Sequence, residues 1–162
     1  MTRRPALPVS VERVPFDDPD ADALRRAQRV ELDARYGSDD HEPGEPPSAD
    51  DVPVFVIARD ETGEAVACGG LRPLDDSVLG RGVIEVKRMF VARGARGSGA
   101  STAVLRALEE RARSRGAVRL VLETGTLQPD AIRFYTREGY THIPLFGGYE
   151  GSAHSVCFGR DL

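Results

Sequence analysis

Hydrophobic and polar positions along the chain follow two different periods in turn. Short runs of β-branched and other apolar residues, as in residues 83–91, are typical of strands, whereas apolar residues three and four apart, as in residues 102–115, are typical of an amphipathic helix. Gly, Pro and Asp separate these runs. The pattern predicts strands over residues 8–16, 52–58, 65–71, 83–91, 118–123, 140–145 and 155–162, and helices over residues 21–35, 102–115 and 129–138.

The order of these elements, β-α-β-β-β-α-β-α-β-β, limits the fold class. It predicts an α/β (α+β) protein with a mixed, mostly antiparallel central sheet of about seven strands flanked by helices. The 162 residues suit one domain with its own core, residues 1–162. Residues 38–51 are acidic and rich in Pro and Gly, and we expect a flexible loop there rather than a domain boundary, because one core needs both sides.

The composition and charge of the chain argue against several classes of function. A net charge of −4 argues against a nucleic-acid partner, and no apolar run approaches the roughly 18 residues of a membrane span. Residues 1–5 lack the apolar stretch of a signal peptide, so we expect a cytoplasmic protein. In that compartment, Cys68 and Cys157 are expected as buried free thiols rather than as a disulfide or a catalytic thiol. The histidines lack ligand spacing, which predicts no metal site.

The turn between the strand at 83–91 and the helix at 102–115 carries the strongest functional signal. Small residues in such a turn let a ligand approach the backbone closely. The start of the helix then directs unpaired N–H groups and the positive end of its dipole toward that ligand. The turn reads Arg96, Gly97, Ser98, Gly99, Ala100 and Ser101. It predicts a phosphate-binding site.

Three segments together resemble the GNAT superfamily of N-acetyltransferases. The turn is similar to the superfamily's pyrophosphate signature, Arg/Gln-x-x-Gly-x-Gly/Ala, and residues 87–91 resemble its bulged fourth strand. Residues 128–140 resemble its Asn-x-x-Ala-x-x-x-Tyr-x-x-x-Gly-Phe segment. Residues 143–158 resemble a bacterial subgroup of small acetyltransferases, some of them named for indole-3-acetic acid.

The resemblance implies acetyl-coenzyme A (acetyl-CoA) as the cofactor. Backbone N–H groups of the turn would hold the pyrophosphate, and the end of the preceding strand would pair with the pantetheine arm as if it were another strand. Ser101 stands where the superfamily has Gly or Ala, and Gln128 where it usually has Asn. The cofactor-binding candidates are Met89, Phe90, Val91, Arg96, Gly97, Ser98, Gly99, Ala100, Ser101, Gln128 and Tyr135.

The implied reaction is acyl transfer, in which an amine attacks the thioester carbonyl directly. A protonated amine must first lose a proton, and the departing thiolate needs a proton or a donor. The resemblance implies Glu85 as the general base and Tyr135 as the general acid. The alternatives are structural: Glu85 could pair with Lys87 or Arg119 on the sheet face, and Tyr135 could anchor the last helix.

The acceptor is expected to be a small molecule or a peptide that carries an amine. Its pocket would draw on the first helix, on strand ends and on the glycine-rich loop at 146–154, which either closes over the substrate or is only a mobile connection. Glu123 could bind a cationic acceptor or act as a second base, and His154 is a less favoured base. The substrate-binding candidates are Glu31, Tyr36, Arg72, Glu123 and Tyr149.

Other functions stay open on the same fold. The chain could sense acyl-CoA or bind a partner without catalysis, or it could use another acyl donor or a hydroxyl acceptor. A dinucleotide-binding fold is disfavoured, because the strands before the turn form a meander rather than a βαβ unit. The exposed edge of the last strand is one route to a homodimer.

Overall fold

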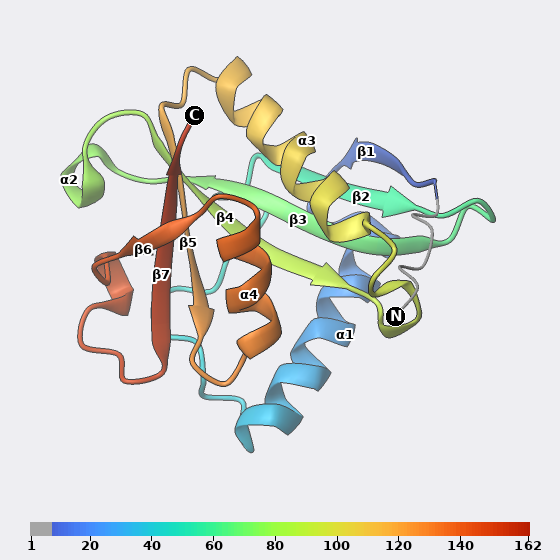
Figure 1. The fold of residues 1–162 in the computed structure, drawn as a ribbon, viewed down its shortest axis with the longest axis horizontal. Helices are drawn as coiled ribbons and strands as arrows, with labels where there is room; N and C mark the ends of the chain where they lie inside the picture. The colour runs from blue at the N-terminus through green and yellow to red at the C-terminus, as the bar shows by residue number, and fades with distance from the viewer. Residues whose placement is uncertain (1–7) are drawn as a thin grey trace.

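The computed structural model describes residues 8–162, and within this range seven strands form one mixed sheet in the order β1-β2-β3-β4-β5-β7-β6 (Figure 1). The strands are β1 (Ser10–Val14), β2 (Val54–Arg59), β3 (Ala65–Pro73), β4 (Val83–Val91), β5 (Arg119–Gly125), β6 (Thr141–Ile143) and β7 (Ser155–Asp161). The helices are α1 (Pro19–Tyr36), α2 (Asp76–Leu79), α3 (Ala100–Ser114) and α4 (Pro129–Arg137). The expectation about a signal peptide concerns residues 1–5, which lie outside the described range.

The predicted fold class and the predicted order of elements are confirmed, with three corrections. Residues 75–82, expected as a turn, contain the short helix α2. The strand expected at 140–145 is only β6, because Pro144 has no N–H group to donate to a neighbouring strand. The last strand, β7, is not an edge: it lies between β5 and β6 and pairs with both. The route to a homodimer through that strand is therefore wrong, and the sheet edges are β1 and β6.

Alternate residues of the central strands pack on opposite faces of the sheet, as the period of a strand requires. One face, which includes Val86, packs against α3 and α4. The other face packs against α1 through Phe55 and Ile57. Glu85 and Lys87 have the opposite parity to Val86 and are both buried on this second face, which confirms their predicted shared side. Their carboxylate and ammonium groups lie 3.8 Å apart.

The first helix is placed by strong signals at both ends. Asp18 caps α1, since its side chain accepts hydrogen bonds from the backbone of Asp20 and Ala21, and Pro19 begins the helix. Gly37 ends it with φ +72°, a left-handed conformation that glycine adopts without strain. The chain then turns into the acidic loop at 38–51, which runs back toward β2.

The two strands at the centre of the sheet separate halfway along their length. β4 and β5 run parallel and pair from Val83 with Arg119 to Val86 with Leu122. Beyond that register, β4 continues to Val91 and β5 to Gly125 without pairing to each other. Arg88 sits at this point with φ +59°, and the register of β4 against β3 shifts there, so the strand is bulged as predicted. The separation opens a groove between the two strand ends.

A buried carboxylate joins α3 to the last strands. Glu109 is 1% exposed and binds Arg160 of β7 at 2.8 Å and Arg106 at 2.6 Å. Its third partner is Tyr140, whose hydroxyl group donates a hydrogen bond to it at 3.1 Å. A buried carboxylate needs such partners, because an unpaired charge in the core is strongly unfavourable. The pattern of the sequence did not single out Glu109.

Candidate active site

The turn between β4 and α3 has the backbone conformation that its glycines predict. Gly97 and Gly99 have φ +78° and +89°, and Gly99 is the residue that caps α3. Among residues 8–162, no hydrogen bond engages the backbone N–H groups of Gly97, Gly99, Ser101 or Thr102. These free donors lie at the start of a 15-residue helix, where the helix dipole favours an anion.

Two of the backbone N–H groups predicted to hold the pyrophosphate form hydrogen bonds within the turn instead. The N–H group of Ser98 donates to the carbonyl of Ala95 at 3.2 Å, and the N–H group of Ala100 donates to the hydroxyl of Ser98 at 3.4 Å. The Ser98 hydroxyl in turn donates to the carbonyl of Ala95, and the side chain is 4% exposed. Ser98 therefore holds the turn in shape from inside.

Arg96 connects this turn to the first helix. Its guanidinium binds the carboxylate of Glu31 at 2.7 Å and donates to the carbonyl of Val91 at 3.2 Å. The hydrogen bond from Arg96 lowers the pKa of Glu31, which keeps that carboxylate ionised. Glu31, which was predicted to bind the acceptor substrate, therefore lies beside the turn and does not line the cavity between β4 and β5.

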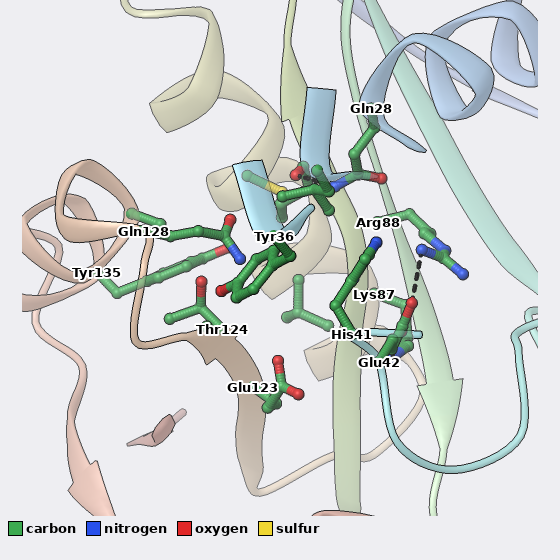
Figure 2. Close-up of a pocket in the computed structure, with 15 residues that line it drawn as sticks. Gln28, Tyr36, His41, Glu42, Lys87, Arg88, Glu123, Thr124, Gln128 and Tyr135 are labelled. Carbon is green, nitrogen blue, oxygen red and sulfur yellow. Dashed lines mark hydrogen bonds and ion pairs between the residues drawn. The ribbon is translucent and has the colours of Figure 1, made fainter. Parts of the chain in front are cut away.

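A cavity of about 90 Å³ lies where β4 and β5 separate, between α1 and α4 (Figure 2). Its lining includes five residues predicted to bind the cofactor or the acceptor, which come from separate parts of the chain: Tyr36, Met89, Glu123, Gln128 and Tyr135. Sequence reasoning missed several of its polar residues, namely Gln28, His41, Glu42 and Thr124, and it left Lys87 and Arg88 outside the site. Gln28, His41 and Glu42 come from α1 and the loop after it, for which no motif gave a signal.

Two side chains of α1 extend into the groove between β4 and β5. The amide nitrogen of Gln28 donates to the carbonyl of Met89 at 2.9 Å. The amide oxygen of Gln28 and the hydroxyl of Tyr36 are buried and have no hydrogen-bond partner among residues 8–162. Buried polar atoms without a partner are costly, so both atoms are suited to meet polar groups of a ligand.

The strand edge predicted to hold the pantetheine arm is accessible on one side only. Phe90 and Val91 pair with Cys68 and Ala67 of β3. Their other edge faces the groove, because β5 no longer pairs with β4 at this level. The carbonyl of Met89 on that edge is the one that Gln28 contacts.

Glu123 lies at the end of β5 and lines the cavity. Burial raises the pKa of its carboxyl group to about 7, and a hydrogen bond from the hydroxyl of Ser155, at 3.0 Å, only partly opposes that shift. A group with this pKa exchanges a proton readily near neutral pH. Burial thus brings the titration of this carboxyl group close to neutral pH.

Tyr135 approaches the cavity from α4. It is 6% exposed and packs against Phe134, Tyr140 and Phe158. Burial raises the pKa of its phenol, so the hydroxyl group keeps its proton at neutral pH. The ring packs in the core and the residue also lines the cavity, and its role as general acid stays a prediction.

Glu85 is held in a buried network outside the cavity lining. It is 1% exposed, accepts hydrogen bonds from Arg72 at 3.0 and 3.2 Å, and accepts one from the hydroxyl of Tyr149 at 2.5 Å. Its ion pairs are with Arg72 and Lys87, whereas Arg119 pairs with Asp161. Arg72 and Tyr149, both predicted to bind the acceptor, are thus partners of Glu85. The role of Glu85 as general base stays a prediction.

The glycine-rich loop at 146–154 packs against the sheet. Phe146 and Tyr149 are 3% and 4% exposed, and their rings meet edge to face at 5.2 Å. They belong to a hydrophobic cluster with Val83 and Val121. His154 lies at the far end, where its ring meets that of Tyr36 at 6.3 Å. The part of the loop that contains Phe146 and Tyr149 is therefore packed in the core.

The remaining chemical candidates give no sign of a second reactive centre. Cys68 and Cys157 are buried free thiols, and burial raises their pKa to about 12 and about 11, which disfavours a reactive thiolate. Within residues 8–162, no group of three or more His, Cys, Asp or Glu side chains is placed to hold a metal ion. No helix in that range combines the length and apolarity needed to cross a membrane.

Comparison with known proteins identifies the family. The model of the acetyltransferase (GNAT) family matches residues 21–140, which include the turn, the groove and Tyr135. The chain belongs to the GNAT acetyltransferase family. An IAA acetyltransferase of Azospirillum brasilense is 39% identical over 108 residues, which make up 67% of this chain and 67% of that protein.

Solved structures agree with this assignment. A proposed acyl-CoA N-acyltransferase of Klebsiella pneumoniae superposes with a TM-score of 0.77 at 31% identity, over 95% of this chain and 97% of that one. A GNAT family acetyltransferase of Elizabethkingia anophelis, solved with acetyl-CoA bound, has a TM-score of 0.67 at 15% identity, over 95% of this chain and 98% of that one. The second likeness concerns the fold alone. In this GNAT domain, β4 leads directly from the cavity to the glycine turn.

Proposed function

We propose that this protein is an acetyl-CoA-dependent N-acetyltransferase that acetylates the amine of a small molecule or a peptide. One observation carries the proposal: β4 leads from a cavity lined by Glu123 and Tyr135 to a turn with free backbone donors. The acetyl-CoA bound to the Elizabethkingia anophelis protein supports the choice of cofactor, and the name of the Azospirillum brasilense relative supports acetyl transfer.

The residues present fit acetyl-CoA. A β-carbon built on Gly97 would meet no atom within 4 Å, so the turn leaves open space beside its free N–H groups. Gly97, Gly99 and Ser101 would hold the pyrophosphate, and the free edge of β4 would hold the pantetheine arm. The unpartnered oxygens of Gln28 and Tyr36 would accept or donate hydrogen bonds in the same groove. Bound acetyl-CoA supplies the acyl group as an activated thioester.

Glu123 and Tyr135 divide the proton transfers between them. Glu123 accepts a proton from the ammonium group of the acceptor, which frees the nitrogen lone pair for attack. The new N–C bond would form at the acyl carbon as the C–S bond breaks, and Tyr135 would donate its phenolic proton to the leaving sulfur. The second proton that the nitrogen loses on becoming an amide would return to the phenolate of Tyr135, and Glu123 would release its proton to solvent. We place Glu123 rather than Glu85 as the base, because Glu123 lines the cavity whereas Glu85 is saturated by Arg72 and Tyr149.

Thermal unfolding with acetyl-CoA, CoA, ATP or NAD tests the cofactor. A ligand at a hundredfold excess over its dissociation constant adds about 2.7 kcal/mol of stability if it binds only the folded state. We expect a shift with acetyl-CoA and CoA alone, and its loss in Gly99→Glu, whose carboxylate would repel phosphate. Gly63→Glu is the matched control, since Gly63 also has a positive φ, +84°, and lies in the β2–β3 turn, outside the predicted phosphate site. A shift with NAD, or none with CoA, would refute the proposal.

Release of the CoA thiol with a panel of amines then separates catalysis from binding alone. Turnover with amines supports the transferase. A thermal shift without thiol release from any amine or alcohol would instead identify an acyl-CoA-binding protein without catalysis. Release with alcohols but not amines would identify a hydroxyl acceptor.

We also place the protein in the cytoplasm. Two buried thiols that form no disulfide support a reducing compartment. Fractionation of the source cells, followed by detection of the chain, tests this location.

A further inference from the structure

The acidic loop at 38–51 inserts one carboxylate between two cations of β4. One oxygen of Glu42 lies 2.9 Å from the ammonium group of Lys87, and the other lies 2.9 Å from the guanidinium of Arg88. Figure 2 shows Glu42 with Lys87 and Arg88 on one side of the cavity, across from Tyr135 and Gln128. Both cations are nearly buried, since their side chains are 7% and 11% exposed. We call Lys87 and Arg88 the cation pair.

The strands supply more positive than negative charge at this point. The two strands β3 and β4 supply three cations, Arg72, Lys87 and Arg88. The fully buried acid on these strands is Glu85. The carboxylates that complete the balance belong to the loop, because Glu42 binds the cation pair and Asp51 lies 3.4 Å from Arg72. Without Glu42, Arg88 would lose its carboxylate and Lys87 would keep only Glu85, which it shares with Arg72, and such a loss is unfavourable for nearly buried cations.

We propose that the cation pair is the binding site for a carboxylate on the acceptor, and that Glu42 occupies this site until the acceptor displaces it. The acceptor is then an aminocarboxylate: its amine faces Glu123 and its carboxylate binds Lys87 and Arg88 in the same cavity. This inference rests on the proposed function, because it names the substrate class of that site.

The size of the cavity agrees with a displaceable Glu42. Pockets for small molecules usually have volumes of about 300–1,000 Å³, whereas the cavity with Glu42 in place has about 90 Å³. Withdrawal of Glu42 would enlarge the cavity at the cation pair. The sequence that follows, Pro43-Gly44-Glu45-Pro46-Pro47, belongs to neither helix nor strand, so its movement would break no regular hydrogen-bond pattern.

The chemistry of Glu42 argues against the reverse role, in which it would bind the amine. Burial raises the pKa of its carboxyl group, but Lys87 and Arg88 lower it more strongly, so the group is ionised and already matched by two cations. An incoming ammonium group would have to compete with both. An incoming carboxylate needs only to replace a carboxylate of the same charge.

Rates of CoA thiol release with paired acceptors test the inference. The panel holds α-amino acids, ω-amino acids and dipeptides, each beside its carboxamide, so that the spacing of amine and carboxylate is also measured. We expect the wild-type protein to prefer at least one acid over its amide by about tenfold in kcat/KM, the value of one charge-assisted hydrogen bond. Preference for the amides, or no difference in any pair, would overturn the inference.

Variants of the cation pair and its loop partner sharpen the test. Arg88→Gln should raise KM for the acids about tenfold and leave KM for the amides within twofold. Glu42→Gln should lower KM for the acids, because it removes the competing carboxylate. Arg26→Gln is the matched control, since Arg26 is an exposed cation of α1 that, among residues 8–162, pairs only with Asp22. Equal effects of Arg88→Gln on acids and amides would refute carboxylate recognition.

Failure of the inference is distinguishable from failure of the proposed function. Thermal shifts with acetyl-CoA are recorded for each variant, because the cation pair is not part of the proposed turn or strand edge that holds the cofactor. A normal shift with no use of any aminocarboxylate would refute the inference alone. Absence of the shift in the wild-type protein would refute the proposed function.

Discussion

The hydroxyl group of Tyr36 lies against the backbone of Gly125, so closely that a β-carbon on Gly125 would be 1.5 Å from its oxygen. Tyr36 is the last residue of α1 and Gly125 the last of β5, so this contact brings the end of the first helix over the separated strands. A glycine inside a strand pattern often marks such an approach of another group to the backbone. The contact explains why β5 ends in glycine beside the cavity.

Substitution Gly125→Ala should displace Tyr36 and destabilise the protein. Forcing an extra methyl group into a packed site costs about 1–3 kcal/mol. Urea denaturation measures the change, and Gly94→Ala, where a new β-carbon would meet no atom within 4 Å, is the control. In a double-mutant cycle with Tyr36→Ala, the two changes should be less than additive, because removing the ring removes the clash. Strict additivity would show that Tyr36 does not occupy this position.

The variant Tyr135→Phe should lose activity and keep its stability. Its hydroxyl group has no hydrogen-bond partner among residues 8–162, so its removal costs little in folding, while loss of the proton donor should lower kcat roughly 100-fold. Tyr140→Phe is the paired control: it breaks the hydrogen bond to buried Glu109 and should cost about 1–3 kcal/mol of stability without a comparable loss of kcat. If both variants turned over like the wild type, Tyr135 would have only its packing role.

The pH dependence of activity should report the carboxyl group of Glu123. With a pKa of about 7, a base at this position predicts that kcat/KM rises with pH and levels off above neutrality. Glu123→Gln should abolish this limb of the profile and lower the rate, while Ser155 can still donate to the amide oxygen. The measurement is the rate of thiol release between pH 5 and pH 9. An unchanged profile in Glu123→Gln, with a changed one in Glu85→Gln, would return the role of base to Glu85.

The same group should affect stability in a defined direction. The pKa of Glu123 is about 7 in the folded protein, against 4.5 as its ordinary value, so the folded state keeps the proton to higher pH than the unfolded chain. Its contribution to stability is therefore complete below pH 4.5 and is lost as pH rises through 7. The side chain of Glu123→Gln cannot ionise. As pH rises from 4.5 to 7, the melting temperature of this variant should therefore increase relative to that of the wild type. A constant difference between the two would contradict the raised pKa.

Removal of the buried carboxylate at Glu109 should weaken the contact between α3 and β7. Glu109→Ala leaves Arg160 and Arg106 without their shared partner, and such a broken buried pair costs roughly 3 kcal/mol. Glu110→Ala, at the next position of the same helix but exposed, is expected to stay within about 0.5 kcal/mol of the wild type. Guanidinium denaturation measures both. Equal stability of the two variants would show that the network around Glu109 contributes nothing net.

Local pattern was sufficient for the fold and the turn. The alternation around Glu85 and Lys87 predicted their common face, and the strand-turn-helix order around Gly97 and Gly99 predicted a turn with unpaired backbone N–H groups. These features depend on neighbours within a few residues, because the periods of strands and helices and the conformational freedom of glycine act locally. The family assignment rests on the same local segments.

The tertiary structure alone decided which charged groups meet. Glu85 and Glu123 are both acids in predicted strands, yet Arg72 and Tyr149 surround the first, whereas the second lines the cavity and has a raised pKa. Glu42, from a loop with no motif, reaches Lys87 across 45 positions of the chain. The physical reason is that burial and pairing of a charge depend on what the fold packs against it, and no local period encodes that partner.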